Sequence, residues 1–116
     1  MISSTSAPHY AWGGSCDGWH LVKGEALSVI QERMPPGSSE VSHHHVFARQ
    51  FFFVLEGELR IAFEDRTETL GSRQGVEIAP GTPHRAFNAS AGDVHFLVVS
   101  QPPSAGDRVV GTETKP

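Results

Sequence analysis

Two histidines separated by a single residue, His43 and His45, are the clearest candidates for chemistry in this chain. Side chains two positions apart on a β-strand point to the same side, so these two imidazoles face one way and His44 faces the other. Imidazole is the commonest protein ligand for zinc, iron, nickel and copper. Such a pair can chelate one ion, although a surface cluster of histidines is the alternative interpretation.

Two further residues complete a candidate ligand set. Gln50 lies on the next expected strand and can turn its carboxamide oxygen back toward the histidine pair, while His84 follows a Pro-Gly turn. Three imidazoles turned inward without partners would be costly, because buried polar groups need hydrogen bonds or a ligand. We therefore predict a metal site formed by His43, His45, Gln50 and His84.

The same alternation assigns sides to the neighbours of these residues. Phe52, two positions after Gln50, and Ala86, two positions after His84, should share the ligand face and line the cavity. Arg49 and Arg85 each adjoin a predicted ligand, so they should point away from it, toward solvent or another subunit.

Other polar residues offer weaker candidates. His95 shares a strand face with Leu97 and Val99 and is expected to be a core histidine, with an extra ligand or a proton shuttle as alternatives. His20 has similar alternatives at the mouth of the fold. The acidic residues fall mostly at turns or outward positions, and no paired carboxylates are predicted. Cys16 has no neighbouring cation to lower its pKa, so no reactive thiol is expected.

The elements that must position these residues are short strands. Several segments alternate apolar and polar residues or are rich in β-formers, and turn residues separate them. No window shows a helical stripe with caps, so we predict an all-β sandwich or barrel. The expected strands are residues 25–34, 43–47, 51–55, 58–64, 67–70, 76–79, 85–89 and 94–101.

The segments outside these strands divide the chain into three parts. Residues 1–24 are predicted to form an N-terminal arm, residues 25–101 the barrel and residues 102–116 a C-terminal tail. Trp12 and Trp19 lie in a Gly-rich stretch of the arm without regular periodicity. Large aromatic side chains there should pack on the core, cover the mouth of the barrel or contact a sister subunit.

Composition sets the outer limits. The 116 residues are 38% hydrophobic and 19% charged, which suits one soluble folded domain. The net charge of −4, with scattered basic residues, makes nucleic acid an unexpected partner. No stretch reaches the roughly 18 apolar residues of a membrane span. A single cysteine and no signal-peptide pattern predict a cytoplasmic protein that does not bind membranes.

The spacing of the candidate ligands resembles that of a known family. Residues 37–57 read Gly-x5-His-x-His-x4-Gln-x6-Gly, which is similar to the first motif of the cupin superfamily, G-x5-H-x-H-x3-4-E-x6-G. Gly81, His84 and Asn88 match the second motif, P-x-G-x2-H-x3-N. The resemblance covers residues 25–101 and implies a small single-domain cupin. Its implied fold is a double-stranded β-helix, or jelly-roll barrel, usually assembled as a homodimer.

The resemblance also implies one divalent transition metal at the barrel centre: zinc, iron, manganese, nickel, cobalt or copper. Two positions depart from the family pattern. Ala79 stands where the second motif has proline, which is a minor change. Gln50 stands where the first motif has glutamate, so the ligand set is neutral and the ion keeps its full +2 charge. Such an ion should attract anions more strongly and act as a better Lewis acid, but should be held less tightly.

Three classes of function follow from this resemblance. Similar sites with three histidines and a glutamine occur in cupins that act on unsaturated uronates and in polyketide cyclases. The first hypothesis is therefore a metal-dependent enzyme that isomerises, tautomerises or cleaves a small oxygenated anion, a sugar acid or a keto acid, with an iron dioxygenase as the rival. The second is a non-catalytic module that binds or senses a small molecule. The third is a structural or partner-binding role, because fold alone does not choose the function.

Overall fold

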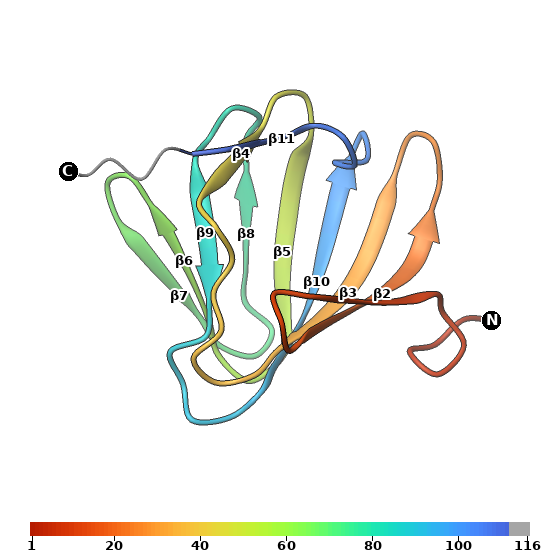
Figure 1. Cartoon of the computed structure of the whole chain (residues 1–116), viewed down its shortest axis with the longest axis horizontal. Coiled ribbons are helices and arrows are strands. Elements are labelled where there is room, and N and C mark those ends of the chain that lie inside the picture. Colours follow the sequence, from red (N-terminus) through yellow and green to blue (C-terminus); the bar gives the residue numbers. More distant parts are fainter. Residues whose placement is uncertain (112–116) are drawn as a thin grey trace.

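The computed structural model, which describes residues 1–111, folds into two facing sheets of antiparallel strands (Figure 1). The all-β prediction is confirmed. One sheet has the order β1 (His9–Trp12), β2 (Cys16–Lys23), β3 (Ser28–Met34), β10 (Val94–Gln101), β5 (Arg49–Glu56) and β8 (Gly75–Ile78). The other has the order β11 (Arg108–Val110), β4 (His43–His45), β9 (His84–Phe87), β6 (Leu59–Phe63) and β7 (Thr67–Leu70).

The core lies between the two sheets, where alternate residues of each strand meet. On β10, Val94, Phe96, Val98 and Ser100 are buried while the residues between them are partly exposed. The apolar run of β5 divides in the same way, with Phe52 buried and Phe51 on the outer face. Burial of each such side chain stabilises the fold by roughly 1.5–3 kcal/mol. Both faces of the larger sheet are thus apolar, one toward the core and one toward the outside.

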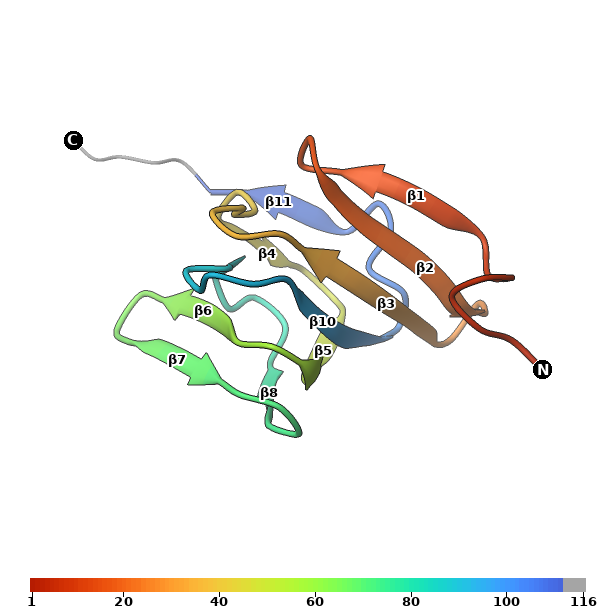
Figure 2. The same cartoon turned by 90° about the horizontal axis from the view of Figure 1, so that it is seen from below.

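The N-terminal segment is regular, contrary to the prediction of an irregular arm. β1 and β2 form a hairpin that pairs with β3 and widens the larger sheet (Figure 2). Glycines hide this pattern in the sequence, because Gly18 occupies an inward position where the Tyr10 ring lies and leaves no room for a side chain. The strands therefore extend beyond the predicted barrel limits of residues 25–101.

The segment after β10 also contains a strand that the sequence analysis did not predict. β11 pairs with β4 in the register Arg108 to His45 and Val110 to His43. Residues 112–116 of the predicted tail lie outside the described residues. Within residues 1–111, no helix is long and apolar enough to cross a membrane.

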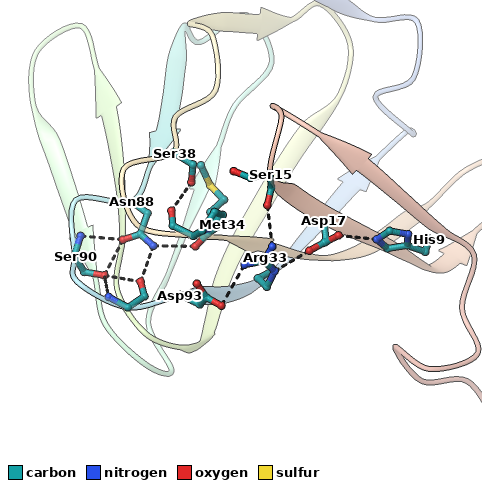
Figure 3. A network of polar contacts seen from close by, with 11 residues as sticks. His9, Ser15, Asp17, Arg33, Met34, Ser38, Asn88, Ser90 and Asp93 are labelled. Carbon is teal, nitrogen blue, oxygen red and sulfur yellow. Dashed lines mark hydrogen bonds and ion pairs between the residues drawn. The ribbon is translucent and has the colours of Figure 1, made fainter.

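Two polar networks join strands and loops at the end of the fold opposite β11 (Figure 3). Arg33 donates to Asp17 at 2.7 Å and to Asp93 at 3.1 Å, which joins β3 to β2 and to the loop before β10. Asn88 donates through Nδ2 to the backbone oxygens of Met34 and Gly92, each at 2.8 Å. These two hydrogen bonds of Asn88 tie the β9–β10 loop to β3.

Candidate metal centre

The three predicted histidine ligands meet between β4 and β9. These strands pair with His43 opposite His84, and the amide of Gly81 donates to the carbonyl of His45 at 2.7 Å. Ring centroids are 4.5 Å apart for His43 and His84, and 4.9 Å apart for His43 and His45. One ring nitrogen from each of the three histidines lies within 4.8 Å of the others. This geometry brings three potential ligand atoms to one point.

Backbone hydrogen bonds fix the orientation of two of these rings. Nδ1 of His43 donates to the carbonyl of Val41 at 2.8 Å, and Nδ1 of His84 donates to the carbonyl of Thr82 at 2.9 Å. Each bond leaves the lone pair on Nε2 free, which is the usual arrangement of a metal-ligating histidine. Among the described residues, Nε2 of His84 and Nδ1 of His45 are buried without a hydrogen-bond partner. A cation would satisfy such orphaned lone pairs.

Gln50 approaches from the opposite sheet. Its Nε2 donates to Oγ of Ser100 at 3.1 Å, while its Oε1 is buried and has no hydrogen-bond partner among residues 1–111. Because the amide nitrogen is engaged with Ser100, the oxygen is the atom left for a ligand. A carbonyl oxygen accepts a metal ion but cannot donate. The donor set of three imidazoles and one amide oxygen therefore fits a divalent transition metal.

Burial keeps the three imidazoles neutral. It lowers the pKa of His43 to about 4, with further lowering by His84 and Arg108. Burial also lowers the pKa of His45 and of His84. Neutral imidazole is the form that binds metal, so protons compete little for this site near neutral pH.

A cavity of about 240 Å³ lies between the sheets beside the histidines. It includes Phe52, as predicted from the sequence, whereas Ala86 is 1% exposed within the hydrophobic core. Trp12 also lines the cavity, so the N-terminal hairpin closes its own barrel. The lining residues are Tyr10, Trp12, Ile30, Glu32, Glu40, His43, His45, Gln50, Phe52, Val98, Ser100, Ser104 and Arg108.

The remaining candidates from the sequence lie outside this centre. Arg49 is exposed and pairs with Glu77 at 3.3 Å, and Arg85 stacks its guanidinium over the Phe87 ring at 4.5 Å. His95 lies on the outer face of β10, so it does not reach the metal site. The His20 ring lies against the Tyr10 ring with centroids 5.0 Å apart and is not among the residues that line the cavity.

The sequence analysis missed the charged groups of the cavity. Glu32 accepts a hydrogen bond from the Tyr10 hydroxyl at 2.8 Å, and burial raises its pKa to about 7. Burial raises the pKa of Glu40 to about 8, and its Oε1 lies 4.0 Å from Nδ1 of His43. Arg108 enters the same cavity from β11. Two carboxyl groups therefore line the cavity, although the sequence analysis expected acidic residues mostly at turns or outward positions.

Strand alternation could have identified one of these groups. Glu32 lies two positions after Ile30, so alternation places it on the same face of β3 as Ser28 and Ile30. Both faces of β3 carry apolar residues, however, so hydrophobicity did not show which one is inside. Arg108 lies on a three-residue strand, which is too short to carry a period.

One protein family matches the greater part of the chain. The family described as "Cupin domain" matches residues 30–100. The uncharacterized protein MJ1618 of Methanocaldococcus jannaschii is 25% identical over 84 residues, which cover 72% of this chain and 67% of that protein. The name of this relative states no activity.

Solved structures share the fold at lower identity. KdgF from Halomonas sp. superposes with a TM-score of 0.81 at 14% identity, covering 89% of this chain and 93% of its own. The polyketide cyclase RemF from Streptomyces resistomycificus superposes with a TM-score of 0.80 at 20% identity, covering 99% of this chain and 87% of its own. At these identities the comparison establishes the architecture alone.

Proposed function

Since the chain belongs to the cupin family, whose domain matches residues 30–100, we propose that it is a metal-dependent enzyme acting on a small oxygenated anion, either a sugar acid or a keto acid. One observation carries this proposal. Three buried imidazoles converge with an amide oxygen that has no hydrogen-bond partner within residues 1–111, beside a cavity that also holds two carboxyl groups. A purely structural cluster of histidines would not need such a cavity.

One divalent transition metal is the proposed cofactor, held by His43, His45, Gln50 and His84. Zinc, iron, manganese, nickel, cobalt and copper all accept this mixture of nitrogen and oxygen donors. When bound, the ion supplies Lewis acidity that polarises a carbonyl or carboxylate oxygen. The chain supports it by fixing the rings of His43 and His84 through backbone carbonyls and by directing the Gln50 oxygen with Ser100.

The charges of the cavity favour an anionic substrate. The four proposed ligands are neutral, so they do not offset the charge of the ion. Arg108 adds a guanidinium to the cavity wall and can bind a carboxylate through two parallel hydrogen bonds. A cavity of about 240 Å³ is below the usual range for drug-sized ligands and suits a small acid.

Redox-neutral chemistry is the reaction class that these groups support best: isomerisation, tautomerisation or elimination. Glu32 and Glu40 provide groups that can hold or release a proton beside a polarised substrate. The resemblance of the ligand set to that of cupins acting on uronates and of polyketide cyclases points the same way. An iron dioxygenase is the rival, and oxygen uptake after addition of Fe(II) and a catechol, thiol or diketone would distinguish it.

A non-catalytic binding module is the second candidate. Trp12 and Phe52 give the cavity two aromatic walls, which would suit a protein that only holds its ligand. Ligand binding that survives replacement of His84, without turnover of any acid, would favour this role. We also propose that the protein acts in the cytoplasm, consistent with its one buried, free cysteine.

Elemental analysis of the untagged protein tests the metal site directly. Wild type should carry about one equivalent of a transition metal, and His84→Ala should lose it because the site keeps only two imidazoles. His44→Ala is the matched control, since His44 lies between two ligands but faces away from them. Wild type that takes up no metal after reconstitution would contradict the proposal.

A further inference from the structure

Glu32 is a partly buried acid of the cavity that the proposed metal set does not explain. It lies on β3, in the sheet opposite the histidine strands, and shares the cavity with His43 and His45. The Tyr10 hydroxyl donates to its Oε2 at 2.8 Å. The other carboxylate oxygen accepts no hydrogen bond from residues 1–111. A carboxyl group that faces a cavity with one oxygen held by a hydrogen bond and the other open to a ligand is typical of functional sites.

Glu40, the second acid of the cavity, is engaged differently. Its Oε1 accepts a hydrogen bond from the amide of Ala86 at 3.0 Å and lies 4.0 Å from Nδ1 of His43. Glu40 thus joins β9 to the segment before β4 and supports the ligand strands. Glu32 has no such bond to the backbone, so it is the acid whose proton can be exchanged without loosening the metal site.

We propose that Glu32 is the proton-transfer residue of the reaction and that Tyr10 is its positioning residue. This inference rests on the proposed function, because it assigns a role within that reaction. The substrate class follows: an acid with a carbonyl group and an adjacent C–H bond, small enough for the cavity, whose carboxylate is bound by Arg108.

The step is balanced without a further reactant. Glu32, as the carboxylate, takes the proton from the carbon next to the carbonyl group. The electron pair of that C–H bond forms a carbon–carbon double bond, and the carbonyl electron pair moves onto the oxygen. The Glu32 carboxylic acid then returns the proton to the enolate oxygen, which gives the enol, or to the carbon that lost it, which restores the substrate. One C–H bond breaks and one C–H or O–H bond forms, so no oxidant is consumed.

The surroundings of Glu32 suit this exchange. Burial raises its pKa to about 7, partly offset by the hydrogen bond from Tyr10 and the charge of Arg108. A group with a pKa near the working pH can serve as base and as acid in one turnover. The titratable or charged groups that face it from neighbouring elements are Tyr10, Cys16, Glu40, His43, His45 and Arg108.

Deuterium exchange tests the proposal with defined probes. Reconstituted protein in deuterium oxide is mixed with 2-oxobutyrate or with D-glucuronate, and loss of the proton next to the carbonyl group is followed by NMR. Glu32→Gln keeps the shape and can still accept from Tyr10. Its exchange rate should fall by about 100-fold or more, with the metal content unchanged and the Kd of the probe within about threefold of the wild-type value. Glu58→Gln, at a 40% exposed side chain outside the cavity, is the matched control.

Tyr10→Phe separates positioning from folding. Loss of the hydroxyl removes a hydrogen bond to the ionised acid, so the pKa of Glu32 should rise. The exchange rate rises with pH as Glu32 loses its proton, so the pH at half-maximal rate should be higher in Tyr10→Phe than in wild type. A purely structural role of Tyr10 would lower the rate at all pH values equally and would overturn its assignment.

Calorimetry gives a readout that does not depend on turnover. Binding of anionic 2-oxobutyrate beside Glu32 favours the protonated acid, so wild type should take up a fraction of a proton, seen as a dependence of the binding enthalpy on the buffer. Glu32→Gln should lose this uptake and Glu58→Gln should keep it. Uptake that persists in Glu32→Gln overturns the proposal.

The outcomes distinguish this inference from the proposed function. Equal exchange rates in wild type and Glu32→Gln would remove Glu32 from the mechanism and leave a metal-dependent enzyme. A wild type that binds metal but exchanges no proton of either probe would overturn the assignment of Glu32 and also count against the enzyme. A wild type that binds no metal would refute the proposed function itself.

Discussion

Gln50 is the residue whose chemistry departs most from the family pattern, and its surroundings define how it can act. The hydrogen bond from its amide nitrogen to Ser100 orients the side chain, so the free oxygen is the buried atom beside the histidines. Glutamate at this position would add a negative charge to a site whose other proposed ligands are neutral. Compared with glutamate, the neutral amide should lower the affinity for the metal ion and strengthen the attraction of the ion for a bound anion.

Gln50→Glu tests this effect of ligand charge on metal affinity. The added charge should tighten binding of Zn²⁺ by about tenfold or more, because even about 1.4 kcal/mol of extra attraction gives that factor. Competition with a chromophoric chelator measures the affinity. Gln101→Glu is the matched control, since Gln101 is exposed and accepts from Arg49 at 3.2 Å. Equal affinity in Gln50→Glu and wild type would mean that residue 50 is not a ligand.

The candidate ligands could be predicted from the sequence because their signal is local. The i and i+2 spacing of His43 and His45 determines their common side within one strand. Glu32 and Arg108 could not be recognised in this way, because their importance depends on which sheet face is buried and on pairing between distant strands. The histidine ligands can be recognised from local sequence spacing, whereas Glu32 and Arg108 can be recognised only once the fold is known.

At the scale of elements, β11 shows how a short strand completes the cavity. Asp107 precedes it and accepts hydrogen bonds from the amides of Val46, Phe47 and Ala48 at 2.9, 3.0 and 2.9 Å. Although desolvation acts in the opposite direction, these three amides hold the pKa of Asp107 below its usual range. The loop after β4 thus anchors the strand that carries Arg108.

Asp107→Ala should release β11 without unfolding the barrel. The amides of residues 108–110 should exchange with deuterium faster by on the order of tenfold, since local opening sets the protection of such edge strands. Removal of Arg108 from the cavity should also weaken binding of 2-oxobutyrate. Hydrogen exchange followed by mass spectrometry measures the first effect and calorimetry the second.

Asp65→Ala serves as the control, because Asp65 lies in the turn between β6 and β7 with a 77% exposed side chain. Protection of residues 108–110 that is identical in Asp107→Ala and wild type would show that strand pairing alone holds β11.

The elements most accessible to prediction were those with long alternating patterns, such as β10, whose limits at residues 94–101 match the prediction. β1 and β2 were missed because glycines interrupt their pattern.

At the scale of the whole molecule, the outer face of the larger sheet lacks a covering layer. Within residues 1–111, the other sheet covers only the inner face, and no helix packs on the outer one (Figures 1 and 2). Apolar side chains at outer positions of adjacent strands lie side by side, as Val29, Val99 and Phe51 do, and such a contiguous patch marks an interface. They include Val22, Leu27, Val29, Phe51, Phe53, Leu55, Leu97 and Val99.

We predict that this face joins two copies of the chain in a homodimer. A second copy offers the same apolar face, so a twofold contact would bury both at once. Light scattering coupled to size exclusion should therefore give twice the chain mass of 12.6 kDa. Phe51→Lys places a charge at the centre of the patch, beside the stacked ring of Phe53, and should shift the protein to the monomer mass at micromolar concentration.

Phe47→Lys is the control that separates this contact from general hydrophobicity. Phe47 is 73% exposed, more than Phe51 at 41%, but it lies in the loop after β4 rather than on the larger sheet. If exposure alone drove association, Phe47→Lys would dissociate the dimer more readily than Phe51→Lys. If the sheet face is the interface, only Phe51→Lys has this effect, because the cost of burying a charge arises only where the two copies meet. A wild type of single-chain mass, or a Phe51→Lys variant that remains dimeric, would contradict the prediction.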